Sequence, residues 1–135
     1  MILRTSLVLA VVTSLAGVGA GARVAWAEHA VTASATTVDH DCGSDPEVAI
    51  SGSTNTITLT GTCTKVAVSG AGNTLTIAAT TRLAISGANN TAAVEQVDRI
   101  AVSGVGNTVT YKRPLTVKKT KTARTGPRNS IKKIK

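Results

Sequence analysis

The sequence has few large side chains and few of the residues that build common reactive sites. Its 135 residues include no phenylalanine, one tryptophan, one tyrosine, three prolines, two cysteines and two histidines. So few aromatic residues argue against a broad core of large side chains, and two cysteines exclude a disulfide-dense scaffold. By contrast, the chain contains 22 threonines together with many valines and isoleucines. Because β-branched residues suit strands better than helices, the composition predicts an all-β protein.

Residues 1–27 have the pattern of a secretory signal peptide. Arg4 supplies a positive start, residues 6–20 form a short apolar run rich in glycine, and Ala25-Trp26-Ala27 gives a small-x-small cleavage pattern. No cysteine follows the cleavage point, which argues against a lipid anchor. We therefore expect an exported protein, secreted or associated with the cell envelope, whose mature chain begins near Glu28 and has no transmembrane segment. An uncleaved membrane anchor is the alternative.

Charge is divided unevenly along the chain. Residues 28–111 contain three basic and seven acidic residues, a net charge of −4, whereas residues 112–135 contain ten basic residues and no acid. A run of like charge with scattered Thr, Gly and Pro favours disorder, so we predict a basic disordered tail over 112–135. Its candidate contacts with polyanions are the ten basic residues Lys112, Arg113, Lys118, Lys119, Lys121, Arg124, Arg128, Lys132, Lys133 and Lys135.

A four-fold internal repeat fills residues 47–111. Each copy has two runs of alternating apolar residues joined by Ser-Gly-x-x-Asn-Thr, and the Ser-Gly pairs are 18, 17 and 17 residues apart. Period-two alternation indicates strands with one buried face, and glycine and asparagine suit the turn between them. The recurring turn residues are Gly52, Gly70, Gly87 and Gly104, and the recurring asparagines are Asn55, Asn73, Asn90 and Asn107.

Two architectures fit this repeat, a β-solenoid with one coil per copy and an antiparallel meander of hairpins. The solenoid is favoured because the same residue types recur at the same phase, and stacked asparagines can bond one another along a ladder. We predict a small single-domain β-solenoid, resembling a parallel β-helix, of about four coils of 17–18 residues with two short strands each. Residues 28–46 would form a linker and cap, and Lys65, Arg82 and Arg99 would share one corner.

Cys42 and Cys63 are the only cysteines of the chain. In an exported chain such a pair is expected to form one disulfide, closing a loop of about 20 residues and contributing about 3 kcal/mol. No histidines lie near them at ligand spacing, so a zinc site is not expected there.

Several of these motifs together resemble a known family. Asp41-Cys42, the strand-turn-strand repeats and the Thr-Gly-Thr-Cys sequence that ends at Cys63 are similar to those of exported bacterial proteins of domain-of-unknown-function family DUF3060, of actinobacterial and mycobacterial type. The resemblance covers residues 40–112. It implies an exported location and a repeat architecture, and it carries no assigned activity.

No catalytic, metal or cofactor site is predicted. His29 and His40 precede the repeats, and no serine or cysteine accompanies them in a nucleophile motif. Residues 39–41 (Asp-His-Asp) could offer ligands to a cation, but successive residues of an extended segment point to opposite sides and do not converge.

These observations favour an exported, non-catalytic structural or binding module of the cell envelope. A binder of polyanions, such as wall polymers, anionic lipid or nucleic acid, is the first alternative. It would act through the basic tail and detach as salt rises. Specific nucleic-acid recognition is not expected, because no aromatic residues are interleaved with the basic ones. An enzyme is the second alternative, and no motif supports it. No oligomeric state is predicted.

Overall fold

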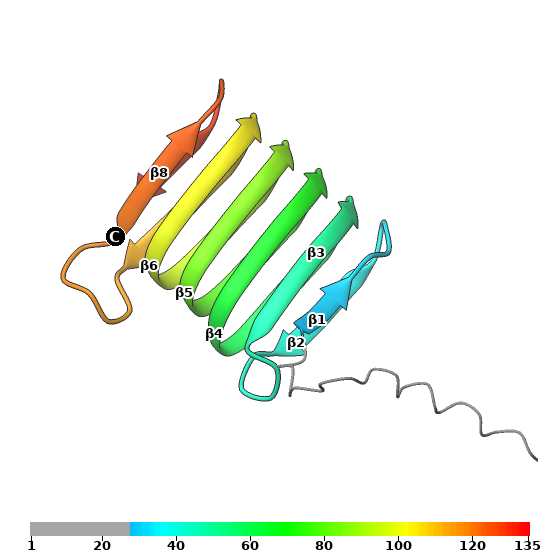
Figure 1. The fold of residues 1–135 in the computed structure, drawn as a ribbon, viewed down its shortest axis with the longest axis horizontal. Helices are drawn as coiled ribbons and strands as arrows, with labels where there is room; N and C mark the ends of the chain where they lie inside the picture. Colours follow the sequence, from blue (N-terminus) through cyan, green and yellow to red (C-terminus); the bar gives the residue numbers. More distant parts are fainter. Residues whose placement is uncertain (1–27) are drawn as a thin grey trace, which may run out of the picture.

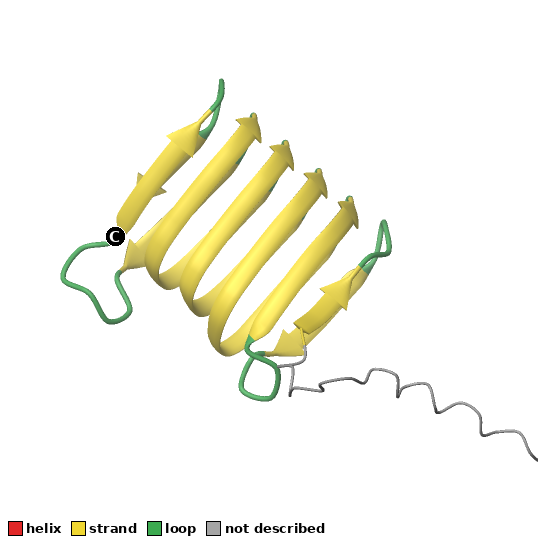
Figure 2. Cartoon of the chain, viewed as in Figure 1, coloured by secondary structure: helices red, strands yellow, loops and turns green. Residues whose placement is uncertain are grey.

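The computed structural model describes residues 28–135, so the signal peptide expected over residues 1–27 lies outside it. The described chain is all-β and winds into a parallel β-solenoid of about six turns with about 18 residues per turn (Figures 1 and 2). Within this part of the chain no helix is long and apolar enough to cross a bilayer.

Nine strands make up one sheet, and every strand pairing is parallel, which excludes the antiparallel meander. The strand order is β1-β3-β4-β5-β6-β7-β9, with β2 pairing β4 and β8 pairing β6. The strands are β1 (Glu28–Val31), β2 (Thr37–Asp41), β3 (Glu47–Ser53), β4 (Thr56–Ala71), β5 (Thr74–Ala88), β6 (Thr91–Val105), β7 (Thr108–Arg113), β8 (Lys121–Thr125) and β9 (Ser130–Lys133).

Each sequence repeat corresponds to one coil. Ser51 pairs with Ser69, and Ser69 with Ser86, so equivalent residues stack on neighbouring coils. The second short strand expected in one repeat continues into the first strand of the next repeat, and the resulting strands β4, β5 and β6 are 16, 15 and 15 residues long. The ladder continues round the corner at Cys63 and Thr80, so these strands break only at the Ser-Gly-x-x-Asn turns.

The interior is filled by columns of aliphatic side chains, one residue from each coil. A further inward column, which the apolar alternation did not reveal, follows the corner and contains Cys63, Thr80 and Val97, all buried. The aliphatic columns are Val48, Val66, Leu83 and Ile100; Ile50, Val68, Ile85 and Val102; Ile57, Leu75, Ala92 and Val109; and Leu59, Ile77 and Val94.

Close stacking of the coils explains the turn glycines. Gly87 has a φ of 131°, and a Cβ at this position would lie 2.0 Å from the carbonyl oxygen of Gly70 in the preceding coil. At Gly52 the φ is outside the left-handed region, yet a Cβ would still lie 2.1 Å from the carbonyl oxygen of Ala33. The approach of the neighbouring backbone therefore requires glycine in both turns.

Both ends of the solenoid extend beyond the predicted four coils. Residues 28–46, expected to be a linker and cap, contribute β1 and β2 as a first coil on β3 and β4. Residues 112–135, expected to be disordered, contribute β8 and β9, which pair with β6 and β7 as a last coil. The solenoid prediction is confirmed with about six coils instead of four. Residues 112–135 contribute strands where a disordered tail was expected, because hydrogen bonding to the neighbouring coil orders segments that lack an apolar repeat of their own.

Candidate functional site

The asparagine column lies along one edge of the interior and is saturated by internal hydrogen bonds. Oδ1 of Asn90 accepts from the backbone N and the Nδ2 of Asn73, both at 3.0 Å. Nδ2 of Asn90 donates to Oδ1 of Asn107 at 3.0 Å and to the carbonyl of Gly70 at 3.1 Å. Asn129 extends the column into the last coil. Because its buried amides are fully used within the fold, this column joins coils and offers nothing to a ligand.

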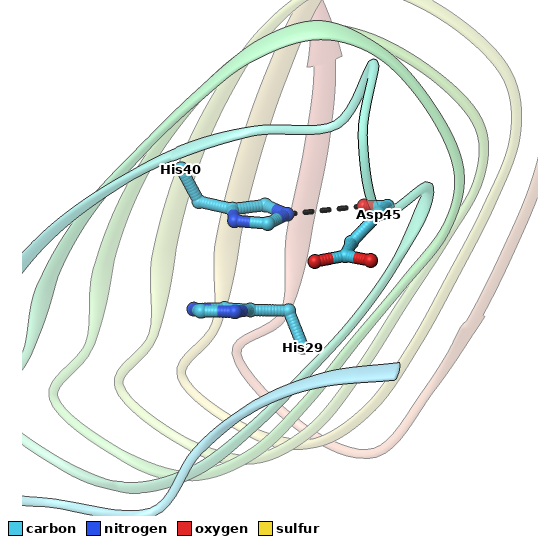
Figure 3. Close-up of side chains that lie close together, drawn as sticks. All are labelled: His29, His40 and Asp45. Carbon is cyan, nitrogen blue, oxygen red and sulfur yellow. Dashed lines mark hydrogen bonds between the residues drawn. The ribbon is translucent and has the colours of Figure 1, made fainter. Parts of the chain in front are cut away.

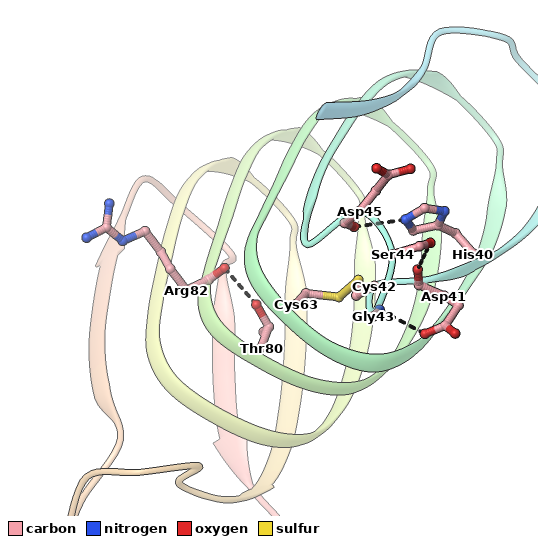
Figure 4. Close-up of a disulfide and its surroundings, with 9 residues drawn as sticks. All are labelled: His40, Asp41, Cys42, Gly43, Ser44, Asp45, Cys63, Thr80 and Arg82. Carbon is pink, nitrogen blue, oxygen red and sulfur yellow. Dashed lines mark hydrogen bonds between the residues drawn. A yellow bond between two sulfur atoms is a disulfide. The ribbon is translucent and has the colours of Figure 1, made fainter. Parts of the chain in front are cut away.

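The loop of residues 42–46 is fixed at the N-terminal end of the solenoid by the predicted disulfide, which the structure confirms. Cys42 and Cys63 are bonded with their Cα atoms 4.9 Å apart, and both are buried (Figure 4). Asp41 shapes the loop, because its carboxylate accepts from the backbone N of Gly43 at 2.9 Å and its carbonyl accepts from the hydroxyl of Ser44 at 3.0 Å. The next residue, Asp45, is thereby positioned beside the first coil.

Two histidines close the interior at this end. His29 on β1 is in register with Val48, and His40 on β2 is in register with Leu59, so both occupy inward columns. Their rings stack with centroids 4.0 Å apart and planes inclined by 16° (Figure 3). Both side chains are half-buried.

Asp45 completes a group of three side chains that we call the histidine cluster: His29, His40 and Asp45. Nε2 of His40 lies 3.0 Å from the backbone carbonyl oxygen of Asp45. One donor atom from each of the three residues lies within 4.8 Å of the others. In the sequence, Asp39 and Asp41 are the acidic neighbours of His40 and candidate cation ligands. Both are exposed in the structure, and the acid that lies near the two histidines is Asp45 of the loop.

A basic column lies outside the solenoid at one corner. Lys65, Arg82 and Arg99 are in register on successive coils, as the sequence suggested, and Lys121 of β8 continues them. We call these four residues the basic column. Adjacent members are about 4.8 Å apart along the solenoid axis, the normal spacing of paired strands. Arg82, Arg99 and Lys121 are exposed, and Lys65 is half-buried.

A hollow of about 250 Å³ lies between this column and the loop of residues 114–120. Three of its lining residues, Arg82, Arg99 and Lys121, belong to the basic column. Thr116 and Val117 of the loop form the opposite side. Asp98 also lines the hollow, so three basic residues and one acid surround it.

Asp98 anchors the loop that forms one side of this hollow. Its carboxylate accepts from the backbone N of Leu115 and Thr116, both at 2.7 Å, from the N of Val117 at 3.2 Å, and from the Thr116 hydroxyl. Burial tends to raise the pKa of Asp98, but these hydrogen bonds, led by the one from the Thr116 side chain, outweigh it and hold the pKa below its ordinary value. This anchor could not be predicted from the sequence, since Asp98 and Thr116 are 18 residues apart along the chain.

The ten basic residues of 112–135 are all exposed. Eight lie on strands or on the anchored loop, Arg128 lies in the turn before β9, and Lys135 follows β9. Lys112 pairs with Glu95 at 2.8 Å, the one ion pair among the residues whose side chains the structure describes. Nη1 of Arg124 donates to the carbonyl of Asn129 at 3.1 Å. Most of the remaining positive charge therefore has no acidic partner within the described chain.

A shallow trough of about 300 Å³ lies on another face. It is lined by outward alanines and serines of the repeats, with Ala67, Ala84, Ser69 and Ser86 near its middle. Small side chains without charge give this trough no chemistry beyond shape.

Comparison with known proteins gives one match. A family model described as "Protein of unknown function (DUF3060)" matches residues 50–93 and again residues 80–122, which together span more than half of the chain. The overlap of the two matches reflects the internal repeat. No curated protein and no solved structure matches the chain.

Proposed function

The chain belongs to the DUF3060 family, which has no assigned activity, and we propose from its structure that it is an exported binding module without catalytic activity. Its partners in this proposal are linear polyanions, such as phosphate-bearing polymers of the cell envelope. Its contacts are the basic column and the basic last coil.

The observation that carries the proposal is the register of the basic column. Four cationic residues occupy the same position on four successive coils, and Lys121, the last of them, belongs to the coil that also holds Arg124, Lys132 and Lys133. A regular line of cations matches a chain that carries an anionic group at every unit. Such contacts release counterions from the polyanion, which is the main source of affinity in charge-driven binding.

Order in the last coil makes it a better binding surface than a disordered tail. β8 and β9 are held by ladders to β6 and β7, and Asp98 holds the loop between β7 and β8. Binding therefore orders only side chains, and the backbone entropy has already been lost on folding. The entropic cost of binding should be correspondingly low.

The distribution of charge also favours binding of a polyanion at one end of the solenoid. Asp39, Asp41, Asp45 and Glu47 lie in the first coil, in the loop that follows it and at the start of β3, whereas the last coil and its loop carry no acid. A polyanion is repelled from one end of the solenoid and attracted to the other.

The histidines give no support to a catalytic function. The hydrogen bond of His40 goes to a backbone carbonyl and its ring stacks on His29, so neither ring is positioned as a base for a serine nucleophile. The disulfide supports the exported location, because such bonds persist in oxidising compartments.

The test is binding of the full chain to immobilised long-chain polyphosphate across a series of salt concentrations. Replacing Arg82, Arg99 and Lys121 with glutamine should weaken binding and reduce the slope of log K against log salt by roughly 0.7 for each charge lost. These residues are exposed, so the fold should not change.

The matched control lowers the net charge equally at the other end, through Ala30→Glu, Thr32→Glu and Thr37→Glu, all exposed positions of the first coil. It should leave the slope unchanged. Equal losses in both variants would mean that only net charge matters and would overturn the proposed surface. Binding to anionic lipid vesicles but not to polyphosphate would replace the polymer with a membrane surface.

A further inference from the structure

The histidine cluster at the N-terminal end is not used by the proposed function. We propose that His29, His40 and Asp45 form a binding site for one divalent transition-metal ion, with Zn²⁺ as the best fit to their donor set. The three residues come from β1, from β2 and from the disulfide-bound loop, so an ion there would join three separate segments of the chain.

The positions of the two histidines are the first reason. In the coils that follow, the columns of His29 and His40 contain Val48, Val66 and Leu59, all of them aliphatic. An end position needs only a side chain that tolerates water, and threonine serves this purpose in the last coil, where Thr122 occupies the His29 column. Two imidazoles facing each other are a more specific arrangement than capping requires.

The distances are the second reason. The donor atoms lie within 4.8 Å of one another. In a tetrahedral zinc site, with ligand bonds of about 2.1 Å, neighbouring donors are about 3.4 Å apart. The largest distance between two donor atoms would therefore have to shorten by somewhat more than an ångström when an ion binds. Rotation of half-buried side chains at an open end permits that movement.

The hydrogen bond of His40 defines what must change when an ion binds through Nε2. A carbonyl oxygen only accepts, so Nε2 of His40 carries the proton in the bond to Asp45. Coordination at Nε2 requires the tautomer that is protonated at Nδ1, and the metal bond replaces the hydrogen bond.

The donor set decides the class of ion. Two imidazole nitrogens and one carboxylate oxygen suit Zn²⁺, Cu²⁺ or Ni²⁺, whereas Ca²⁺ and Mg²⁺ prefer oxygen ligands alone. The described residues contain no free cysteine, so thiolate does not compete for the ion. Three protein ligands leave one tetrahedral position for water.

The test is calorimetric titration of the metal-free, disulfide-bonded full chain, without an affinity tag, with Zn²⁺ alone. We expect one ion per chain. His29→Gln and His40→Gln should each lower affinity roughly tenfold or more, since loss of a direct ligand should cost at least as much as loss of the groups that orient it. With Cu²⁺ in place of Zn²⁺, the electron paramagnetic resonance spectrum should show hyperfine coupling of the copper to two nitrogens in the unchanged chain and to one in either variant.

Asp39→Asn is the matched control, because Asp39 adjoins His40 in the sequence but is exposed and outside the cluster. It should bind Zn²⁺ like the unchanged chain. Asp45→Asn alters a half-buried loop residue rather than an inward column, and should weaken binding even if a histidine variant fails to fold. Absence of stoichiometric binding, or binding unchanged in both Asp45→Asn and the folded histidine variants, would overturn the proposal.

Discussion

The interior coils and the two terminal coils follow the same backbone path but place different chemistry inside. Coils between β3 and β7 fill their inward columns mainly with valine, leucine, isoleucine and alanine, together with Cys63 and Thr80 at the corner. The first coil places His29 and His40 in two of those columns. An interior coil has a neighbour on each side, whereas a terminal coil has one and must end the stack. The terminal coils therefore act as caps, and this position accounts for their departures from the repeat.

The last coil shows how such a cap works. Arg124 is in register with buried Val102, and Lys133 with half-buried Tyr111, so charged residues stand where the core would otherwise continue. Arg124 bonds to the carbonyl of Asn129 within the same coil. Inward charges at a free strand edge oppose pairing with another chain, because that pairing would bury them.

The loss of stability on removing an asparagine of the column should differ most between an interior coil and a terminal coil. Asn90→Ala deletes four internal hydrogen bonds and leaves buried partners unsatisfied, which should cost about 4 kcal/mol of unfolding free energy. Asn129 is also buried, but its coil has a neighbour on one side only, so local opening of this last coil can expose the four bonds lost in Asn129→Ala to water, and this variant should cost less, about 2 kcal/mol. Urea unfolding measures both, and equal losses would contradict the distinction.

The disulfide gives the next largest effect, on the first coil and its loop. Replacing Cys42 and Cys63 together with serine removes a link between residues 21 apart, and should lower stability by about 3 kcal/mol. Hydrogen exchange of the backbone amides should then speed up more in β1 and β2 than in β5, relative to the unchanged chain. The same change in exchange across β5 and β6 would show that the disulfide supports the whole solenoid rather than its end.

At the other end the corresponding attachment is Asp98. Asp98→Ala removes the acceptor for three backbone amides and one hydroxyl, and should cost about 2 kcal/mol. Hydrogen exchange should increase in residues 114–120 and in β8. Glu95→Ala is the control, because its ion pair with Lys112 is exposed and should contribute little.

These contrasts also explain what could be predicted from the sequence. The interior coils, their register and the disulfide follow from repeated patterns, because identical coils require identical residues. The last coil could not be predicted from the repeat, because Asn129 lies 22 residues after Asn107 instead of 17. In addition, Thr122, Arg124 and Lys133 break the apolar alternation. A weaker signal was present, since Thr125-Gly126 and Asn129-Ser130 preserve the turn chemistry.

The first coil carried a similar faint signal. Residues 28–31 read Glu-His-Ala-Val, which matches Glu-Val-Ala-Ile at residues 47–50 except that histidine replaces valine and valine replaces isoleucine. The position of Asp45 near the histidines could not be predicted, because it depends on the course of the loop after Cys42. Sites at the ends of a repeat arise where the pattern fails, so the pattern itself cannot locate them.

Acid should weaken the attachment at Asp98 selectively. The pKa of Asp98 is lower in the folded chain than in the unfolded chain, where it is about 3.9. The contribution of Asp98 to the free energy of unfolding is therefore fully present above the unfolded pKa and is lost as pH falls through the folded pKa. The stability difference between the unchanged chain and Asp98→Ala should therefore be constant near neutrality and shrink below about pH 4. Unfolding curves across this range measure it, and a difference that persists in strong acid would exclude the carboxylate as its source.

The smallest effect on stability should come from the inward charges of the last coil. Arg124→Leu and Lys133→Leu together should change the unfolding free energy by less than about 1 kcal/mol, since both side chains are exposed. They should instead promote association, because an apolar free edge now faces solvent beside unpaired strands. Analytical ultracentrifugation should show concentration-dependent oligomers for this variant and fewer for the charge-matched control Lys118→Leu with Lys119→Leu, which lies in the loop. Equal association of both variants would mean that lost net charge, rather than the cap, controls the end of the stack.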